Sequence, residues 1–212
     1  MKKFINYLAI VMLSVAFASC KKNDLNYPDG YVGISKITQY PVITVTGATY
    51  TSVVKGSTYT DAGAKAGSLT VTSSGTVNTA TVGLYIITYK AVNSDGFPGS
   101  ATRYVAVLPS ADLGIDISGK YDYAAGGKTV NMTKLAPGFY YVEGLYSAAT
   151  TIPAYLICVN GTNITVPSQA TSFGNLNGTA TLAGLTAGST LNYVINLPDQ
   201  GIAGSTRRWI RK

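Results

Sequence analysis

The chain has 212 residues, of which 12% are charged and 46% are hydrophobic, and its formal net charge is +7. This hydrophobic content excludes an intrinsically disordered chain, and the charged fraction is about half of the roughly 25% that is usual for soluble domains. The basic residues are scattered except for short clusters after residue 20 and at the C-terminus, and no nucleic-acid-binding motif is present. Nucleic acid is therefore not an expected partner.

Residues 1–20 have the anatomy of a secretory signal peptide. Lys2 and Lys3 precede an apolar stretch that runs from Phe4 to Phe17, and small residues follow it. A retained transmembrane helix is the alternative, but the stretch is shorter than the roughly 20 residues that a membrane span needs. The sequence therefore predicts that this segment is removed.

The sequence Phe17-Ala-Ser-Cys20 resembles the lipobox of bacterial lipoproteins, although Phe17 replaces the usual leucine. The resemblance implies that Cys20 becomes the first residue of the mature protein and carries several acyl chains, which would anchor it stably. We expect an outer-membrane location facing the cell exterior, with residues 21–36 as a flexible tether because Asn, Asp, Pro and Gly occur there. Cys158 would then have no disulfide partner, and its apolar neighbours predict a buried side chain.

Residues 37–109 are predicted to form an immunoglobulin-like β-sandwich. Apolar and polar residues alternate there in short runs bounded by Gly, Asn and Ser, which is the pattern of half-buried strands. Several short strands of this kind are typical of an antiparallel sandwich. The runs are Val42–Thr46, Leu69–Thr72, Tyr85–Val92 and Thr102–Leu108.

Four segments in this region, Gly56–Ala64, Leu69–Thr72, Ser74–Thr79 and Val82–Ala91, together resemble a bacterial surface-protein Ig-like domain, domain of unknown function 5011. Many members of that family carry an acidic stretch after the Asp-x-Gly turn, and this chain lacks it. Because calcium takes about six to eight oxygen ligands, largely from carboxylates, no metal site is expected. Asp61 is instead interpreted as a turn residue that hydrogen-bonds its own backbone.

Residues 110–212 are predicted to form a second domain, a small antiparallel β meander that closes towards a barrel or sandwich. Turn signals such as Gly-Gly, Pro-Gly and Asn-Gly separate its strand-like runs, and closure would remove unpaired edges. The fold class of the whole chain is therefore all-β. The runs are Gly119–Tyr123, Lys128–Leu135, Phe139–Glu143, Ala154–Val159, Thr162–Val166, Thr179–Leu182, Leu191–Leu197 and Arg207–Arg211.

Short motifs of this second domain, Ile117–Tyr121, Val130–Lys134, Gly138–Val142 and Ser172–Gly174, resemble domain of unknown function 5012. That C-terminal β domain follows the Ig-like module in certain lipoproteins of glycan-foraging Gram-negative bacteria. The resemblance implies a place in a polysaccharide-utilisation system, with polysaccharide or outer-membrane importer components as partners. This implication rests on domain layout alone.

Few residues are suited to catalysis. The chain has no histidine, which excludes Ser-His and Cys-His mechanisms and most zinc sites. Glycoside hydrolysis needs two carboxyl groups that face each other across a cleft, and Glu143, the best acid candidate, has no obvious partner. We therefore expect no enzymatic activity, no catalytic residue and no cofactor.

Carbohydrate binding requires flat aromatic faces and a few hydrogen-bonding side chains, and the chain has 16 tyrosines and one tryptophan. About half of the aromatic side chains of alternating strands should point into the core. The sequence therefore predicts a non-catalytic surface lipoprotein whose Ig-like spacer presents a domain for glycan or protein binding. A purely structural or adhesive spacer without glycan affinity is the alternative. The candidate glycan contacts are Tyr121, Tyr123, Tyr140, Tyr146, Tyr155 and Trp209.

Overall fold

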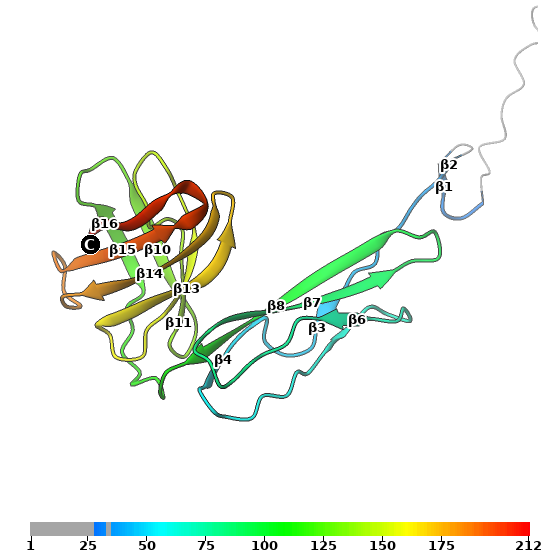
Figure 1. Ribbon diagram of the computed structural model, residues 1–212. Coiled ribbons are helices and arrows are strands. Elements are labelled where there is room, and N and C mark those ends of the chain that lie inside the picture. The colour runs from blue at the N-terminus through cyan, green and yellow to red at the C-terminus, as the bar shows by residue number, and fades with distance from the viewer. Residues whose placement is uncertain (1–27, 33–34) are drawn as a thin grey trace, which may run out of the picture. The chain divides into compact units, whose positions relative to one another are not determined.

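The computed structural model describes residues 28–32 and 35–212 and divides the chain into two units (Figure 1). In the first unit, Met1–Gln39, the described residues include an antiparallel pair of two short strands, β1 (Tyr31–Val32) and β2 (Ser35–Lys36). The second unit, Tyr40–Lys212, holds the remaining strands. No helix in the described ranges has the length and apolarity of a membrane span.

The structure confirms the prediction of an all-β chain. The second unit begins with an Ig-like module. It contains a two-stranded sheet, β3-β5, and a four-stranded sheet in the order β4-β8-β7-β6. Strand β4 runs parallel to β8, whereas the other pairs are antiparallel. The strands are β3 (Thr44–Val45), β4 (Tyr50–Val54), β5 (Ala64–Lys65), β6 (Thr72–Ser74), β7 (Gly83–Val92) and β8 (Pro98–Leu108).

Side chains along β7 alternate between the core of this module and solvent. Ile87, Tyr89 and Ala91 are buried, while Ile86 and Val92 on the other face are exposed, as the period of an antiparallel strand requires. Half-buried side chains of the smaller sheet and its loops cover Ile87 and Tyr89. The module therefore has a narrow apolar core between its two sheets.

A buried ion pair crosses this core. The guanidinium of Arg103, which is 3% exposed, contacts the carboxylate of Asp61 and also donates through Nε to the Ala48 carbonyl at 3.1 Å. The Tyr89 hydroxyl donates to Oδ1 of Asp61 at 2.7 Å. The Gly63 N–H donates to Oδ2 of Asp61 at 3.2 Å, which is the predicted turn contact. Asp61 thus joins its own turn to strands β7 and β8, a role that the sequence analysis missed.

Strands β9 to β16 form a closed barrel in which sequence neighbours pair in turn and β16 pairs with β9. Each of the predicted strand-like runs corresponds to one of these strands. The barrel lies beside the Ig-like module within the second unit (Figure 1). Its strands are β9 (Gly119–Tyr123), β10 (Thr129–Ala136), β11 (Phe139–Val142), β12 (Ala154–Ile157), β13 (Asn163–Thr171), β14 (Gly174–Leu182), β15 (Thr190–Leu197) and β16 (Ile202–Arg211).

Side chains fill the interior of the barrel. Tyr121, Tyr140, Tyr193 and Trp209 are each at most 1% exposed and pack with aliphatic residues from strands β10 to β16. The indole N–H of Trp209 donates to the Leu145 carbonyl at 3.0 Å. The barrel is thus a packed core rather than a ligand-holding pore, as expected for a barrel of this strand number.

The Ig-like module packs against the outer wall of the barrel through a small apolar cluster, which we call the junction core. It consists of Ala106 and Leu108 from β8, Phe139 from β11, Ile157 from β12, and Val159. Each is at most 8% exposed. The two modules therefore share buried surface and form one compact unit.

The linker between the modules is tied to the barrel beside the junction core. The Gly138 N–H donates to Oδ2 of Asp112 at 2.9 Å, and Lys134 forms an ion pair with the same oxygen at 3.3 Å. Gly138 has a φ of +64°, and a Cβ on it would lie 3.1 Å from Cδ1 of Leu108. Only glycine combines this left-handed backbone with so close an approach of the two modules.

The Asp61 carboxyl should control stability at acid pH. Burial opposes its ionisation, but hydrogen bonds from Tyr89 and the charge of Arg103 outweigh this and lower its pKa. Because the folded-state pKa is below the unfolded value of about 4, the carboxylate stabilises the fold above that pH. This contribution is lost as the pH falls through the folded-state pKa.

We expect Asp61→Asn to lower the free energy of unfolding by about 2–4 kcal/mol at pH 7, because Arg103 is left buried and unpaired. The figure is below that for a fully buried pair, since the Asp61 side chain is 26% exposed. The variant should also lose less stability than the wild type between pH 5 and pH 3. Urea denaturation across this range checks both effects, and equal stability of the two proteins at pH 7 would contradict the assignment.

Candidate functional site

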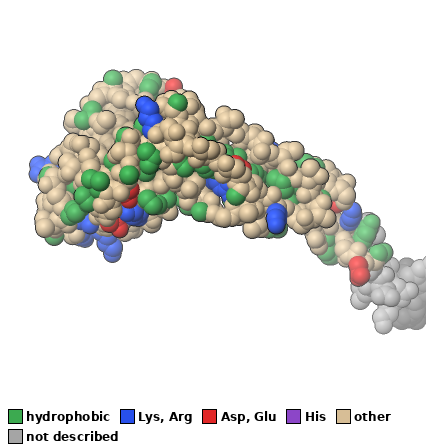
Figure 2. Space-filling view, turned by 90° about the horizontal axis from the view of Figure 1, so that it is seen from below, with side chains coloured by type: hydrophobic (Ala, Val, Ile, Leu, Met, Phe, Trp, Pro, Cys, Tyr) green, Lys and Arg blue, Asp and Glu red, His purple; other side chains and the backbone are tan. Residues whose placement is uncertain are grey.

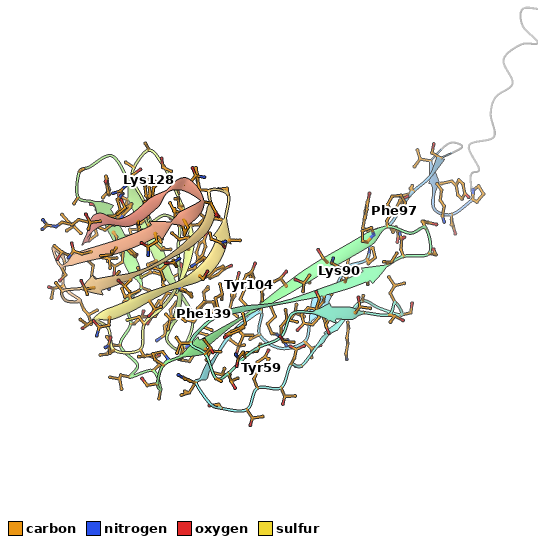
Figure 3. The ribbon with its side chains drawn as sticks, in the orientation of Figure 1. Tyr59, Lys90, Phe97, Tyr104, Lys128 and Phe139 are labelled. Carbon is orange, nitrogen blue, oxygen red and sulfur yellow. The ribbon has the colours of Figure 1, made fainter. Side chains whose placement is uncertain are left out.

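Four half-buried tyrosines line up where the Ig-like module meets the barrel. The rings of Tyr50 and Tyr104, from β4 and β8, stack with centroids 5.3 Å apart and an interplanar angle of 20°. The Tyr155 ring of β12 lies 4.8 Å from Tyr104, and the Tyr141 ring of β11 lies 5.5 Å from Tyr155. Figure 3 labels Tyr104 and Phe139 at this boundary. The aromatic row thus passes from one module to the other.

Three of these rings line a hollow of about 330 Å³, which we call the junction cleft. Tyr104 closes it from the Ig-like side, and Tyr141 and Tyr155 line it from the barrel side. Thr171 and Ser172 add hydroxyl groups to its lining. Its volume and its mixture of apolar surface with a few polar groups are typical of small-molecule sites.

Gln169 fixes the position of Tyr155. Strands β12 and β13 share only the Ile157–Thr165 pair, so the Tyr155 backbone lacks a regular partner on that side. The Gln169 side chain supplies one: its Oε1 accepts from the Tyr155 N–H at 2.8 Å, and its Nε2 donates to the Tyr155 carbonyl at 3.0 Å. Gln169 is 8% exposed, so this bidentate contact is sheltered from water. Tyr155 is therefore held in place by hydrogen bonds to its backbone as well as by the packing of its ring.

The phenols of Tyr141 and Tyr155 in the junction cleft are neutral at physiological pH. Burial raises the pKa of Tyr155 above its ordinary value, and burial has the same effect on Tyr141. A neutral phenol can donate and accept a hydrogen bond while its ring offers an apolar face. The cleft thus presents the chemistry that a neutral, hydroxyl-rich ligand with apolar C–H faces would match.

The structure corrects half of the predicted glycan contacts. Tyr121, Tyr140 and Trp209 lie inside the barrel at no more than 1% exposure, so they cannot contact a glycan while the barrel is folded. Their alternating positions were compatible with either face, and the structure assigns them to the core. Cys20, the predicted lipid-attachment residue, lies outside the described residues.

The other three candidates are half-buried but lie in different places. Tyr155 lines the junction cleft. Tyr123 packs against the barrel core with its ring 5.1 Å from that of Trp209. Tyr146 lies under the guanidinium of Arg207, which is 4.0 Å from the ring centroid. The structure therefore does not bring the predicted aromatic residues together at one surface.

Tyr104 and Tyr141 line the cleft but were not among the contacts predicted from the sequence. A signal for Tyr141 was present, since it neighbours Tyr140 on an alternating strand, and one of the two had to face outwards. No comparable signal existed for Tyr104, because its exposure depends on which wall of the barrel the Ig-like module covers.

Glu143, the best acid candidate in the sequence, does not have the environment of a general acid. Glu143 is exposed and accepts hydrogen bonds from the backbone N–H and the side chain of Asn131, both at 2.9 Å. These bonds lower its pKa, whereas a general acid needs a raised one. Within residues 28–32 and 35–212, no three Cys, Asp or Glu side chains gather as metal ligands. Cys158 is buried as predicted, and burial raises its pKa.

Charged side chains are dispersed over the face shown in Figure 2, with acidic groups among the basic ones. No continuous basic surface is visible on that face. The electrostatic pattern of this face therefore does not resemble the basic patch of a nucleic-acid-binding protein.

Comparison with known proteins places the Ig-like module in a family. Residues 43–107 match the model of the bacterial surface protein Ig-like domain. Among solved structures, the chain is similar to the lipoprotein BT2262 from Bacteroides thetaiotaomicron, with 19% identity over 81% of this chain and 99% of that chain and a TM-score of 0.36. No curated protein matches the chain significantly. The first module is thus an Ig-like domain of the bacterial surface-protein type, whereas the more specific resemblances of both domains stay predictions.

Proposed function

We propose that the protein is a non-catalytic lipoprotein of the outer-membrane surface, anchored through Cys20, whose junction cleft binds a carbohydrate. The lipobox-like sequence before Cys20 supports the anchor. The match of residues 43–107 to a surface-protein domain supports the location. In this proposal the Ig-like module is a spacer that carries the barrel, within a system that takes up polysaccharide and includes a membrane importer.

The junction cleft is the observation that carries the carbohydrate proposal. Tyr141 and Tyr155 offer partly desolvated ring faces, and Ser172 offers a hydroxyl group beside them. The Thr171 hydroxyl also lines the cleft but donates to the Gly174 carbonyl at 2.8 Å. A sugar ring has the matching features, because its C–H faces pack on aromatic rings and its hydroxyl groups need hydrogen-bond partners. The cleft spans both modules, so a ligand would contact the spacer and the barrel together.

A structural spacer without glycan affinity is the second candidate, and the same rings provide the observation that favours it. Tyr104 and Tyr155 contact each other directly and join the side chains around the junction core. In that case the aromatic row only holds the two modules together. Replacing a ring at the edge of this row distinguishes a glycan-binding function from a purely structural one.

Tyr141 is suited to this test because it lies at the barrel end of the row. We expect the full chain in detergent to be retarded by at least one polysaccharide in affinity electrophoresis. Tyr141→Ala should weaken that interaction about fivefold, since one aromatic contact contributes on the order of 1 kcal/mol. Tyr31→Ala is the matched control, because Tyr31 is 41% exposed and does not line the cleft. Absence of retardation across a broad polysaccharide panel would favour the spacer function.

The anchor has its own test. We expect intact-protein mass spectrometry of membrane fractions to show a mature protein that begins at Cys20 and carries acyl chains. Cys20→Ser should abolish the added lipid mass and move the protein out of the membrane fraction, because no other covalent anchor is proposed. An intact leader, or a mature terminus without fatty acid, would contradict the lipoprotein assignment.

A further inference from the structure

Exposed large hydrophobic side chains are frequent in the sequence on both sides of the boundary between the two units. Of the twelve exposed large hydrophobics among the described residues, five fall within residues 31–42. These are Tyr31, Val32, Ile37, Tyr40 and Val42. Single exposed apolar residues are ordinary, so an interaction surface is indicated only where such residues lie together within one unit.

Two members of this group continue onto the β7–β8 hairpin of the second unit. The Tyr40 ring meets the Phe97 ring edge-on, with centroids 5.5 Å apart and an interplanar angle of 68°. Tyr40 and Val42 are 62% and 81% exposed, and Val92 and Phe97 of the hairpin are 53% and 40% exposed. We call these four residues the tip patch. Figure 3 shows Phe97 at one end of the hairpin, with Tyr104 towards the other.

The backbone holds the tip patch in place. The Asn93 N–H donates to the Phe97 carbonyl at 3.0 Å and closes the turn. The Pro41 carbonyl lies so close to Gly99 that a Cβ there would be 2.2 Å from its oxygen. The segment around Pro41 therefore packs closely against β8, with Tyr40 in contact with Phe97 and the neighbouring Val42 exposed.

The position of the patch along the chain indicates what it faces. Tyr40 is the first residue of the second unit, and Cys20 precedes it by 20 positions, 40 minus 20. A chain of that length reaches at most about 70 Å even when fully extended. A lipid on Cys20 would thus keep the bilayer within reach of the patch at a high effective concentration, so even a weak contact would be populated.

The chemistry of the patch matches a lipid surface. Tyr side chains favour the headgroup region because the ring is apolar and the hydroxyl is polar, and Val42 and Phe97 add apolar surface. Lys90 is exposed on the same face of β7 as Val92, two residues away, while Asp95 lies in the turn. With one basic and one acidic group at the hairpin, apolar contact rather than charge would dominate.

We propose that the tip patch rests on the surface of the bilayer in which the Cys20 lipid is anchored. This inference rests on the proposed lipid anchor but not on the proposed carbohydrate ligand. The contact would orient the Ig-like module on the membrane through its β7–β8 turn. The tip patch thus serves as a second, weaker attachment that sets the orientation of the protein.

Fluorescence quenching by lipid tests the contact directly. The full chain, with acylation of Cys20 verified by mass, is reconstituted into phosphatidylcholine vesicles that contain nitroxide-labelled lipid. One sample carries a fluorophore at Ser94→Cys in the hairpin turn, and the control carries it at Thr206→Cys on β16. Both positions are exposed, and Cys158 is buried and does not compete for the label.

We expect the label at position 94 to lose most of its fluorescence and the label at position 206 to keep it. Adding Val42→Asp, which changes a residue that is 81% exposed, should restore the fluorescence at position 94, whereas Leu113→Asp should not. Equal fluorescence at the two labels, or quenching at position 94 that survives Val42→Asp, would overturn the proposal. Quenching that increases with the amount of protein per vesicle, and not with the fraction of nitroxide-labelled lipid, would overturn the proposal and indicate contact between two copies of the protein. Because the acylation is verified first, these failures count against the patch and not against the anchor.

Discussion

The apolar contact between β8 of the Ig-like module and the wall of the barrel is the constraint on which the candidate site depends. Leu108, Phe139 and Ile157 are nearly inaccessible to water, so separating the modules would expose them at a cost of several kcal/mol by the usual area relation. Because this contact fixes where β8 lies, it also brings Tyr104 to Tyr155 and forms the junction cleft. The site thus belongs to neither module alone.

The two modules are stabilised in different ways. The barrel closes on itself through β9 and β16 and buries its aromatic interior, so its outer wall is the surface that it can offer. The Ig-like module has a thin core and relies on the ion pair between Asp61 and Arg103 to join a loop to its main sheet. A ligand at the junction and a membrane at the tip patch would therefore act on opposite ends of the same β7–β8 hairpin.

Local patterns in the sequence predicted most of the strands but little of the site. Every strand of the barrel was anticipated, because alternation and turn residues are local signals. Strands β1, β2, β4 and β5 were not anticipated. Strands β1, β2 and β5 have only two residues each, β1 and β2 lie in the segment that was expected to be a flexible tether, and β4 contains Thr51 and Ser52 within an otherwise apolar run. The pairing of Asp61 with Arg103 joins residues 42 positions apart, and the choice between Tyr140 and Tyr141 depends on strand register. Both are set by tertiary contacts that no local pattern contains.

The most direct test of the account is the distance between the two modules in solution. Spin labels at Ser73→Cys on β6 and Thr206→Cys on β16 place one probe on each module at exposed positions. Pulsed electron paramagnetic resonance should give one narrow distance distribution, which broadens when Leu108→Ala removes part of the junction core. A broad distribution in the protein without Leu108→Ala would show that the modules move independently, and it would contradict a site built between them.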